Sequence, residues 1–212
     1  HEDYPQPGIY ALVLNNETIE KILADEKQDF SNRRSIRTYP NYRNILILTQ
    51  PKETSCVQLI SGGQPEYSSF EDERITKIGS HSETEHILLQ ESFHQPPQIP
   101  FGLEPEHDWC FYYEKATLAR QLNDWNEVER LGKQAFDLGL YPQDEIEWMP
   151  FLQASAYLDN TARMNEIASS LISDLRVAQQ ACSTLTAMPL SPSTLELADE
   201  IFQELLLPSL KI

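Results

Sequence analysis

A proline-rich segment separates two parts of the chain that differ in hydrophobic periodicity. Residues 94–105 read HQPPQIPFGLEP and hold four prolines in twelve positions. Because proline fixes φ and removes a backbone donor, we expect this segment to be an extended linker. The sequence therefore predicts a small domain at residues 1–93, a linker at 94–106 and a second domain at 107–212.

The part before the linker contains short strand-like runs. Residues 44–50 (NILILTQ) and 56–60 (CVQLI) are joined by a turn-rich connection, which predicts a hairpin. Residues 86–91 (HILLQE) are expected to return as a third strand, and residues 9–14 (IYALVL) read as a strand or as the buried start of a helix. We expect a small α/β unit whose sheet has three or four strands.

Two helices are expected in the same part of the chain. Asn16 is a candidate N-cap for a helix that runs to about Phe30. Residues 69–72 (SFED) resemble a capping box that opens a short helix ending near Ile78.

The part after the linker has the 3.6-residue period of amphipathic helices. One stripe at this spacing comprises Trp125, Val128, Leu131, Ala135 and Leu138. Turn-forming residues interrupt the pattern at positions 123–124, 139–142, 160 and 189–192. These breaks leave about six helices, and their short connections favour antiparallel neighbours. The predicted fold class is α+β overall, with the small α/β unit followed by an all-α domain of antiparallel helical hairpins.

Two of the expected hairpins resemble each other at an offset of roughly 36–39 residues. The sequence Trp109-x-x-Tyr112 corresponds to Trp148-x-x-Phe151, and Leu122-Asn123-Asp124 corresponds to Leu158-Asp159-Asn160. These correspondences predict that one structural unit occurs at least twice.

The stretch 112–140 resembles the tetratricopeptide repeat family. The matching positions are the aromatic Tyr112, the small residues Ala116, Ala119 and Ala135, and the turn sequence DWNE at 124–127. Val128 and Gly132 depart from the family pattern, which expects alanine and an aromatic residue there. The resemblance implies stacked helical hairpins, and small residues at the crossings let paired helices approach closely.

A narrower resemblance rests on residues 107–116 (HDWCFYYEKA), 119–125 (ARQLNDW) and 50–57 (QPKETSCV). They are similar to the C-terminal soluble regions of large bacterial polytopic membrane proteins that look like lipid-linked-sugar glycosyltransferases. The resemblance implies that the catalytic acids lie in the membrane part. This chain would then be a non-catalytic accessory or interaction domain whose partner is the membrane-embedded portion of the same polypeptide, or another protein.

That resemblance also gives an expectation for location. The chain begins at His1 without an initiator Met, so we expect a processed or cut piece of a longer protein. It would be membrane-associated through missing segments and extracytoplasmic, with a cytoplasmic location as the alternative. The rival functions are a stand-alone enzyme with a site between the two halves, and a free tetratricopeptide-type adaptor that binds peptides.

Charge and motif content exclude several classes of function. The chain has 16 Lys+Arg against 33 Asp+Glu, a net charge of −17. Nucleic-acid binding is not expected, because phosphate neutralisation needs a cationic surface. No run reaches the ~18 apolar residues of a membrane span, and neither common phosphate-binding glycine loop is present. We expect no cofactor, no metal and no transmembrane segment in this chain.

The three cysteines, Cys56, Cys110 and Cys182, are far apart and form no CxxC motif. This spacing excludes a zinc ribbon. Two interpretations remain open: one disulfide with one free thiol, or three buried thiols that act as small apolar side chains.

The region 33–43 (RRSIRTYPNYR) carries four of the sixteen cations of this acidic chain. Arginine binds phosphate or carboxylate in a bidentate manner, and tyrosine adds hydroxyl donors. The candidate anion-binding residues are Arg33, Arg34, Arg37, Tyr39, Tyr42 and Arg43. The alternative is that these arginines pair with carboxylates of the same domain.

A second candidate set is aromatic. Helical arrays often use a concave groove to bind partners. The candidate groove residues are Trp109, Tyr112, Tyr113 and Trp148, and the alternative is that they form the core between helices. The sequence HSETEH at 81–86 is interpreted as a solvated loop rather than a metal site, and no catalytic residue is assigned.

Overall fold

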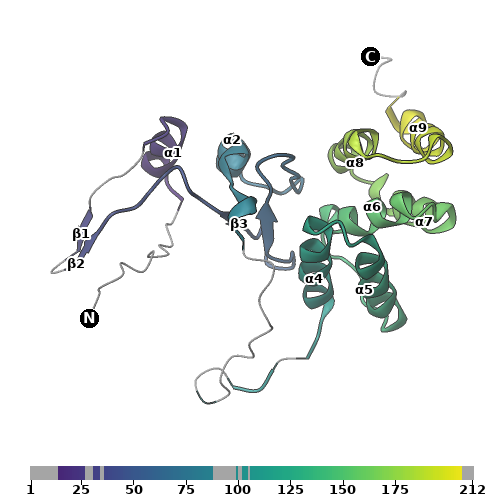
Figure 1. Ribbon diagram of the computed structural model, residues 1–212, viewed down its shortest axis with the longest axis horizontal. Helices are drawn as coiled ribbons and strands as arrows, with labels where there is room; N and C mark the ends of the chain where they lie inside the picture. The colour runs from purple at the N-terminus through teal and green to yellow at the C-terminus, as the bar shows by residue number, and fades with distance from the viewer. Residues whose placement is uncertain are drawn as a thin grey trace.

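The computed structural model describes residues 14–26, 31–33, 36–87, 99, 102–104 and 106–206 of the 212-residue chain. The fold is α+β and mostly helical, as predicted (Figure 1). An N-terminal part holds two short helices and the strands, and a C-terminal part is a stack of longer helices. The predicted linker lies largely outside the described residues.

Among the described residues, the strands form two separate antiparallel pairs. β1 (Ser31–Arg33) pairs with β2 (Ile36–Thr38), and β3 (Ile47–Thr49) pairs with β4 (Gln58–Ile60). The second pair confirms the predicted hairpin. The sequence predicted one sheet of three or four strands, with a third strand beginning at His86. In the structure His86 lies instead in a 3₁₀ turn, η2 (Thr84–His86), and the two strand pairs are separate sheets. Residues 88–91 and 9–13 of the other expected strands lie outside the described residues.

Two capped helices pack beside the β3–β4 hairpin. α1 (Asn16–Leu23) begins after Asn15, whose side chain accepts from the Thr18 N–H at 2.9 Å. It ends well before Phe30, in a turn with positive φ at Asp25. α2 (Glu73–Ile78) begins after Asp72, ends where predicted, and continues into η1 (Gly79–His81).

The N-terminal part has a small isoleucine-rich core. Its buried residues are Ile19, Ile22, Tyr42, Ile47, Ile60, Ile75 and Ile78. They come from both helices and the β3–β4 hairpin, so this core depends on contacts between short elements that are marginal alone.

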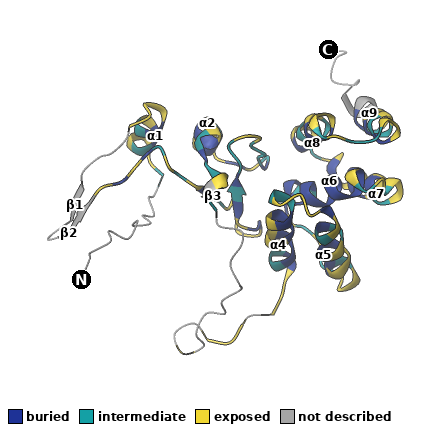
Figure 2. Ribbon diagram, in the orientation of Figure 1, coloured by how far each residue is buried: buried dark blue, intermediate teal, exposed yellow. Residues whose placement is uncertain are grey.

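The C-terminal part contains six α-helices within the described residues. They are α4 (Trp109–Gln121), α5 (Trp125–Asp137), α6 (Met149–Tyr157), α7 (Thr161–Leu171), α8 (Leu175–Ala187) and α9 (Pro192–Leu206). A short 3₁₀ helix, η3 (Glu145–Trp148), precedes α6. Consecutive helices pack against each other, and α4 contacts α6, which in turn contacts α8. Figure 2 shows α6 as largely buried between its neighbours.

The first two helical hairpins repeat each other at the level of their turns. Asn123 and Asp159, 36 positions apart, both have positive φ, at 56° and 54°. The next residue in each turn, Asp124 or Asn160, caps the second helix of its hairpin. Four buried pairs share this offset: Val128 and Met164, Leu131 and Ile167, Gly132 and Ala168, Ala135 and Leu171.

Gly132 allows α5 to approach α6 closely. A Cβ atom at this position would lie 2.6 Å from Cδ1 of Phe151, whose side chain is fully buried. The rings of Trp109 and Phe136 lie 5.3 and 5.9 Å from the Phe151 ring, so that ring has little room to move. Gly132 on α5 therefore leaves room for the Phe151 ring of the facing helix α6.

We predict that Gly132→Ala lowers the free energy of unfolding by about 1–2 kcal/mol. Overpacking costs about 1–3 kcal/mol and exceeds the gain of about 1 kcal/mol in helix propensity. Denaturant unfolding measures the difference. Gly63→Ala is the control, because no atom lies within 4 Å of its added Cβ. A Gly132→Ala variant as stable as the wild type would contradict the close approach.

Candidate functional site

The main candidate site is a segment of the N-terminal part that lies against the helical array. We call residues 55–71 the strap. It includes β4 and the loop that follows, and it contacts side chains of α4 and α8 and of the residues at and before η3. α4 and α8 are the first helices of the first and third helical hairpins.

A disulfide ties the strap to the helical array. Cys56 bonds to Cys110 in the first turn of α4, with Cα atoms 5.1 Å apart and a sequence separation of 54. Cys182 is a free thiol. The structure therefore has one disulfide and one free cysteine. In the chain-entropy model, closing a loop of this length stabilises the fold by about 4 kcal/mol.

A fully buried carboxylate lies beside this disulfide. Glu147 accepts hydrogen bonds from the Cys56 N–H at 2.7 Å, the Trp109 indole N–H at 2.8 Å and the Gln143 N–H at 3.3 Å. Burial raises the pKa of Glu147 above its ordinary value of 4.5, and these hydrogen bonds oppose the rise. Glu147 therefore joins the strap, α4 and the segment before η3.

A second buried carboxylate binds two strap hydroxyls. Oδ2 of Asp144 accepts from Ser55 Oγ and Ser68 Oγ, both at 2.7 Å, and all three residues are buried. Because one carboxylate oxygen bridges two points of the strap, it fixes the path of the chain on both sides of β4.

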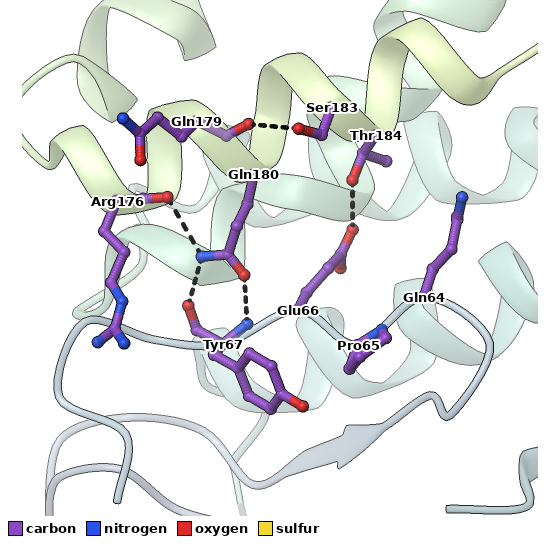
Figure 3. A pocket seen from close by; sticks show the side chains of 9 residues that line it. All are labelled: Gln64, Pro65, Glu66, Tyr67, Arg176, Gln179, Gln180, Ser183 and Thr184. Carbon is purple, nitrogen blue, oxygen red and sulfur yellow. Dashed lines mark hydrogen bonds between the residues drawn. The ribbon is translucent and has the colours of Figure 1, made fainter. Parts of the chain in front are cut away.

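The strap backbone is bound by a side-chain amide of α8. Gln180 Oε1 accepts from the Tyr67 N–H, and Gln180 Nε2 donates to the Tyr67 C=O, both at 2.8 Å (Figure 3). This pairing recognises an extended backbone independently of the side chain. The Tyr67 ring packs on Gly79 in the N-terminal part, where an added Cβ would lie 1.9 Å from the hydroxyl oxygen.

Side chains of the strap make further polar contacts with the helices. Glu66 forms an ion pair with Arg120 of α4 at 2.7 Å, and both side chains are largely buried. The same guanidinium donates to Gln153 of α6 at 3.1 Å. Ser69 Oγ donates to Asp174, the N-cap of α8, at 2.7 Å. The strap thus occupies this face of the array through both its backbone and its side chains.

A pocket of about 470 Å³ lies between the strap and α8 (Figure 3). Its lining residues are Gln64, Pro65, Glu66, Tyr67, Arg176, Gln179, Gln180, Ser183 and Thr184. The two walls are fixed to each other by the pairing of Gln180 with Tyr67. The pocket is therefore preformed.

The predicted anion-binding residues are partly described. Tyr42 is buried in the N-terminal core, and Tyr39 is exposed. The Arg43 guanidinium forms an ion pair with the Asp25 carboxylate at 2.8 Å and donates to the Asp25 C=O at 2.8 Å. The side chains of Arg33, Arg34 and Arg37 lie outside the described residues. For Arg43, the structure shows pairing with a carboxylate of the same chain.

The predicted groove aromatics pack between helices. Trp109, Tyr112 and Tyr113 are buried, as the alternative interpretation expected. Trp148 is half-buried and stacks on Phe136 at a centroid distance of 5.6 Å. None of the four lines the pocket. Sequence reasoning did not identify Glu66 of the strap, nor Asp144, Glu147 and Gln180, which bind the strap.

No metal centre is found in the part of the chain that the structure describes. There, no three or more His, Cys, Asp or Glu side chains are placed to hold an ion. The same part contains no helix with the length and hydropathy needed to cross a bilayer. In comparisons with known proteins, the chain matches no family model, no curated protein and no solved structure.

We predict that Glu147→Gln lowers the free energy of unfolding by about 2–3 kcal/mol, because an amide nitrogen would face donors that need an acceptor. The raised pKa adds a pH dependence. The stabilisation that the wild type gains from the raised pKa of Glu147 is complete below pH 4.5 and is lost as the pH rises through the pKa of the folded protein. The glutamine of the variant does not titrate. The difference in unfolding free energy between wild type and variant therefore becomes smaller as the pH rises.

Urea unfolding at about pH 5 and about pH 8 tests both parts. Glu145→Gln is the matched control, because Glu145 lies in the same short helix and its side chain makes no hydrogen bond to any residue that the structure describes. A loss equal to that of Glu145→Gln, or a difference that widens with pH, would show that Glu147 does not bind the strap as described.

Proposed function

We propose that this chain is a non-catalytic interaction domain built on tetratricopeptide-like hairpins, and that it belongs to a larger membrane protein resembling a glycosyltransferase. The observation that carries the proposal is the strap, which is bound to α4, to α8 and to Asp144 and Glu147 before α6. The membrane context rests on the sequence resemblance together with the disulfide.

The helical part supports tetratricopeptide-like stacking. α4–α5, α6–α7 and α8–α9 form three successive hairpins, and their first helices lie next to each other. The offset between the first two turns is close to the 34-residue repeat of that family. Gly132 and Ala168 occupy equivalent buried positions, where short side chains permit close helix packing.

The strap supports a role in interaction rather than catalysis. Repeat arrays present extended concave surfaces that bind other segments. Here the array binds a peptide backbone through Gln180 and a carboxylate side chain through Arg120. The buried carboxylates of Asp144 and Glu147 accept hydrogen bonds from the strap, which is a structural use of these acids.

The disulfide supports an extracytoplasmic location. Disulfides persist in oxidising compartments and are rare in the cytosol. Cys56 is almost fully buried, so the bond is protected from reductants while the protein is folded. A free cytosolic adaptor would instead carry both cysteines as thiols.

We predict that the full-length gene product sediments with the membrane fraction of its natural host and that Cys56 and Cys110 are oxidised there. Alkylating free thiols at lysis, followed by mass spectrometry of unreduced peptides, detects the linked pair. The linkage should be unchanged in a Cys182→Ser variant, because Cys182 is outside the pair. A soluble product with alkylated Cys56 and Cys110 would favour the cytosolic adaptor instead.

A further inference from the structure

The two parts of the chain have separate hydrophobic cores (Figure 1). Most buried residues of the N-terminal core are isoleucines of α1, α2 and the β3–β4 hairpin, whereas the other core is built from α4 to α9. Among the residues that the structure describes, Cys56 is the one N-terminal residue buried in the core of the helical array. Each part is therefore stabilised mainly by its own apolar packing.

The strap is bound to the array through polar groups and one covalent bond. The polar contacts are the Glu66–Arg120 ion pair and the hydrogen bonds to the side chains of Asp144, Glu147, Asp174 and Gln180. Water supplies partners for the same groups when the strap leaves the array, so the net contribution of each contact is small. A polar interface between two parts of one chain permits relative motion unless something else holds it.

The burial of two carboxylates further weakens the polar interface. Asp144 and Glu147 are buried under the strap, and burial raises the pKa of Glu147. Removing a carboxylate from water is costly, and undocking of the strap returns both groups to water. The hydrogen bonds to these carboxylates therefore offset a cost that the docked state itself creates, and the disulfide is the remaining restraint.

We propose that the Cys56–Cys110 disulfide is a redox latch. When it is oxidised, it holds the strap on the helical array; when both cysteines are thiols, the strap leaves the array while the helices stay folded. The bond closes a loop with a sequence separation of 54. In the chain-entropy model, loss of such a closure shifts the opening equilibrium by up to about a thousandfold. The latch is closed in an oxidising compartment and open in the cytosol.

The latch closes by thiol–disulfide exchange with an external disulfide. Cys110 is half-buried and Cys56 is 1% exposed, so the external reagent reaches Cys110 first. The Cys110 thiolate attacks the external disulfide, releases one external thiol and forms a mixed disulfide. The Cys56 thiolate then attacks Cys110 Sγ as the strap docks, and the second external thiol leaves. The chain loses two electrons and two protons, which the external disulfide gains.

The test compares three forms of the 212-residue chain: oxidised, refolded in excess phosphine reductant, and the Cys56→Ser variant. Amide hydrogen exchange, followed by NMR, reports on the N–H groups of residue 56 and Tyr67, which donate to Glu147 and Gln180 across the boundary. We expect both amides to exchange about tenfold to a thousandfold faster in the reduced chain and in the variant. Amides of α5 and α7, which do not bind the strap backbone, should change by less than about twofold.

Three controls separate the latch from damage to the fold. Cys182→Ser should exchange like the oxidised wild type, because Cys182 is outside the pair. Cys110→Ser should reproduce the result of Cys56→Ser, since it removes the same bond. Oxidised glutathione should restore slow exchange in the reduced wild type and leave Cys56→Ser unchanged.

Two results would overturn the proposal. Unchanged exchange at residue 56 and Tyr67 after loss of the bond would show that the polar contacts alone hold the strap. A rise in α5 and α7 equal to that of the strap would show that the disulfide is required for the helical fold itself. The inference does not depend on the proposed membrane context, which is tested separately by thiol state and fractionation.

Discussion

The buried carboxylate of Glu147 is the contact on which the arrangement of the two parts depends. A carboxylate removed from water is costly unless donors surround it. Its three donors come from the strap, from α4 and from the segment before η3, and these segments are distant in sequence. The disulfide from Cys56 to Cys110 adds a covalent bond between the strap and α4. Together they hold the strap against the helices at one end, and the Tyr67–Gln180 pairing holds it at the other.

The local elements were predictable because their signals are local. The helices, the β3–β4 hairpin and the turns at Asn123 and Asp159 follow from periodicity and from residues that tolerate positive φ. The caps shifted by one to three residues: Asn15 caps α1 in place of Asn16, and Asp72 caps α2 in place of Ser69. Such shifts are expected when several adjacent residues are competent caps.

The candidate site was not predictable by the same reasoning. The bonds from the Cys56 N–H to Glu147 and from the Tyr67 N–H to Gln180 join residues 91 and 113 positions apart. No periodicity encodes such pairs, and a glutamate is expected at the surface by default. The aromatic residues of α4 were ambiguous for a related reason. This helix is covered by α5 on one face and by the strap on another, so its buried residues do not form a single stripe.

The position of the strap also restricts where the array can bind anything else. Residues 55–69 already use Arg120 of α4, Gln153 of α6 through that arginine, and Asp144 and Glu147 before α6. On α8 they use Gln180 and Asp174 but leave the stripe from Arg176 to Ser183 exposed. A conventional repeat array presents its whole first-helix face to a partner. In this chain a segment of the same polypeptide covers part of that face, where it is bound to α4 and to α8.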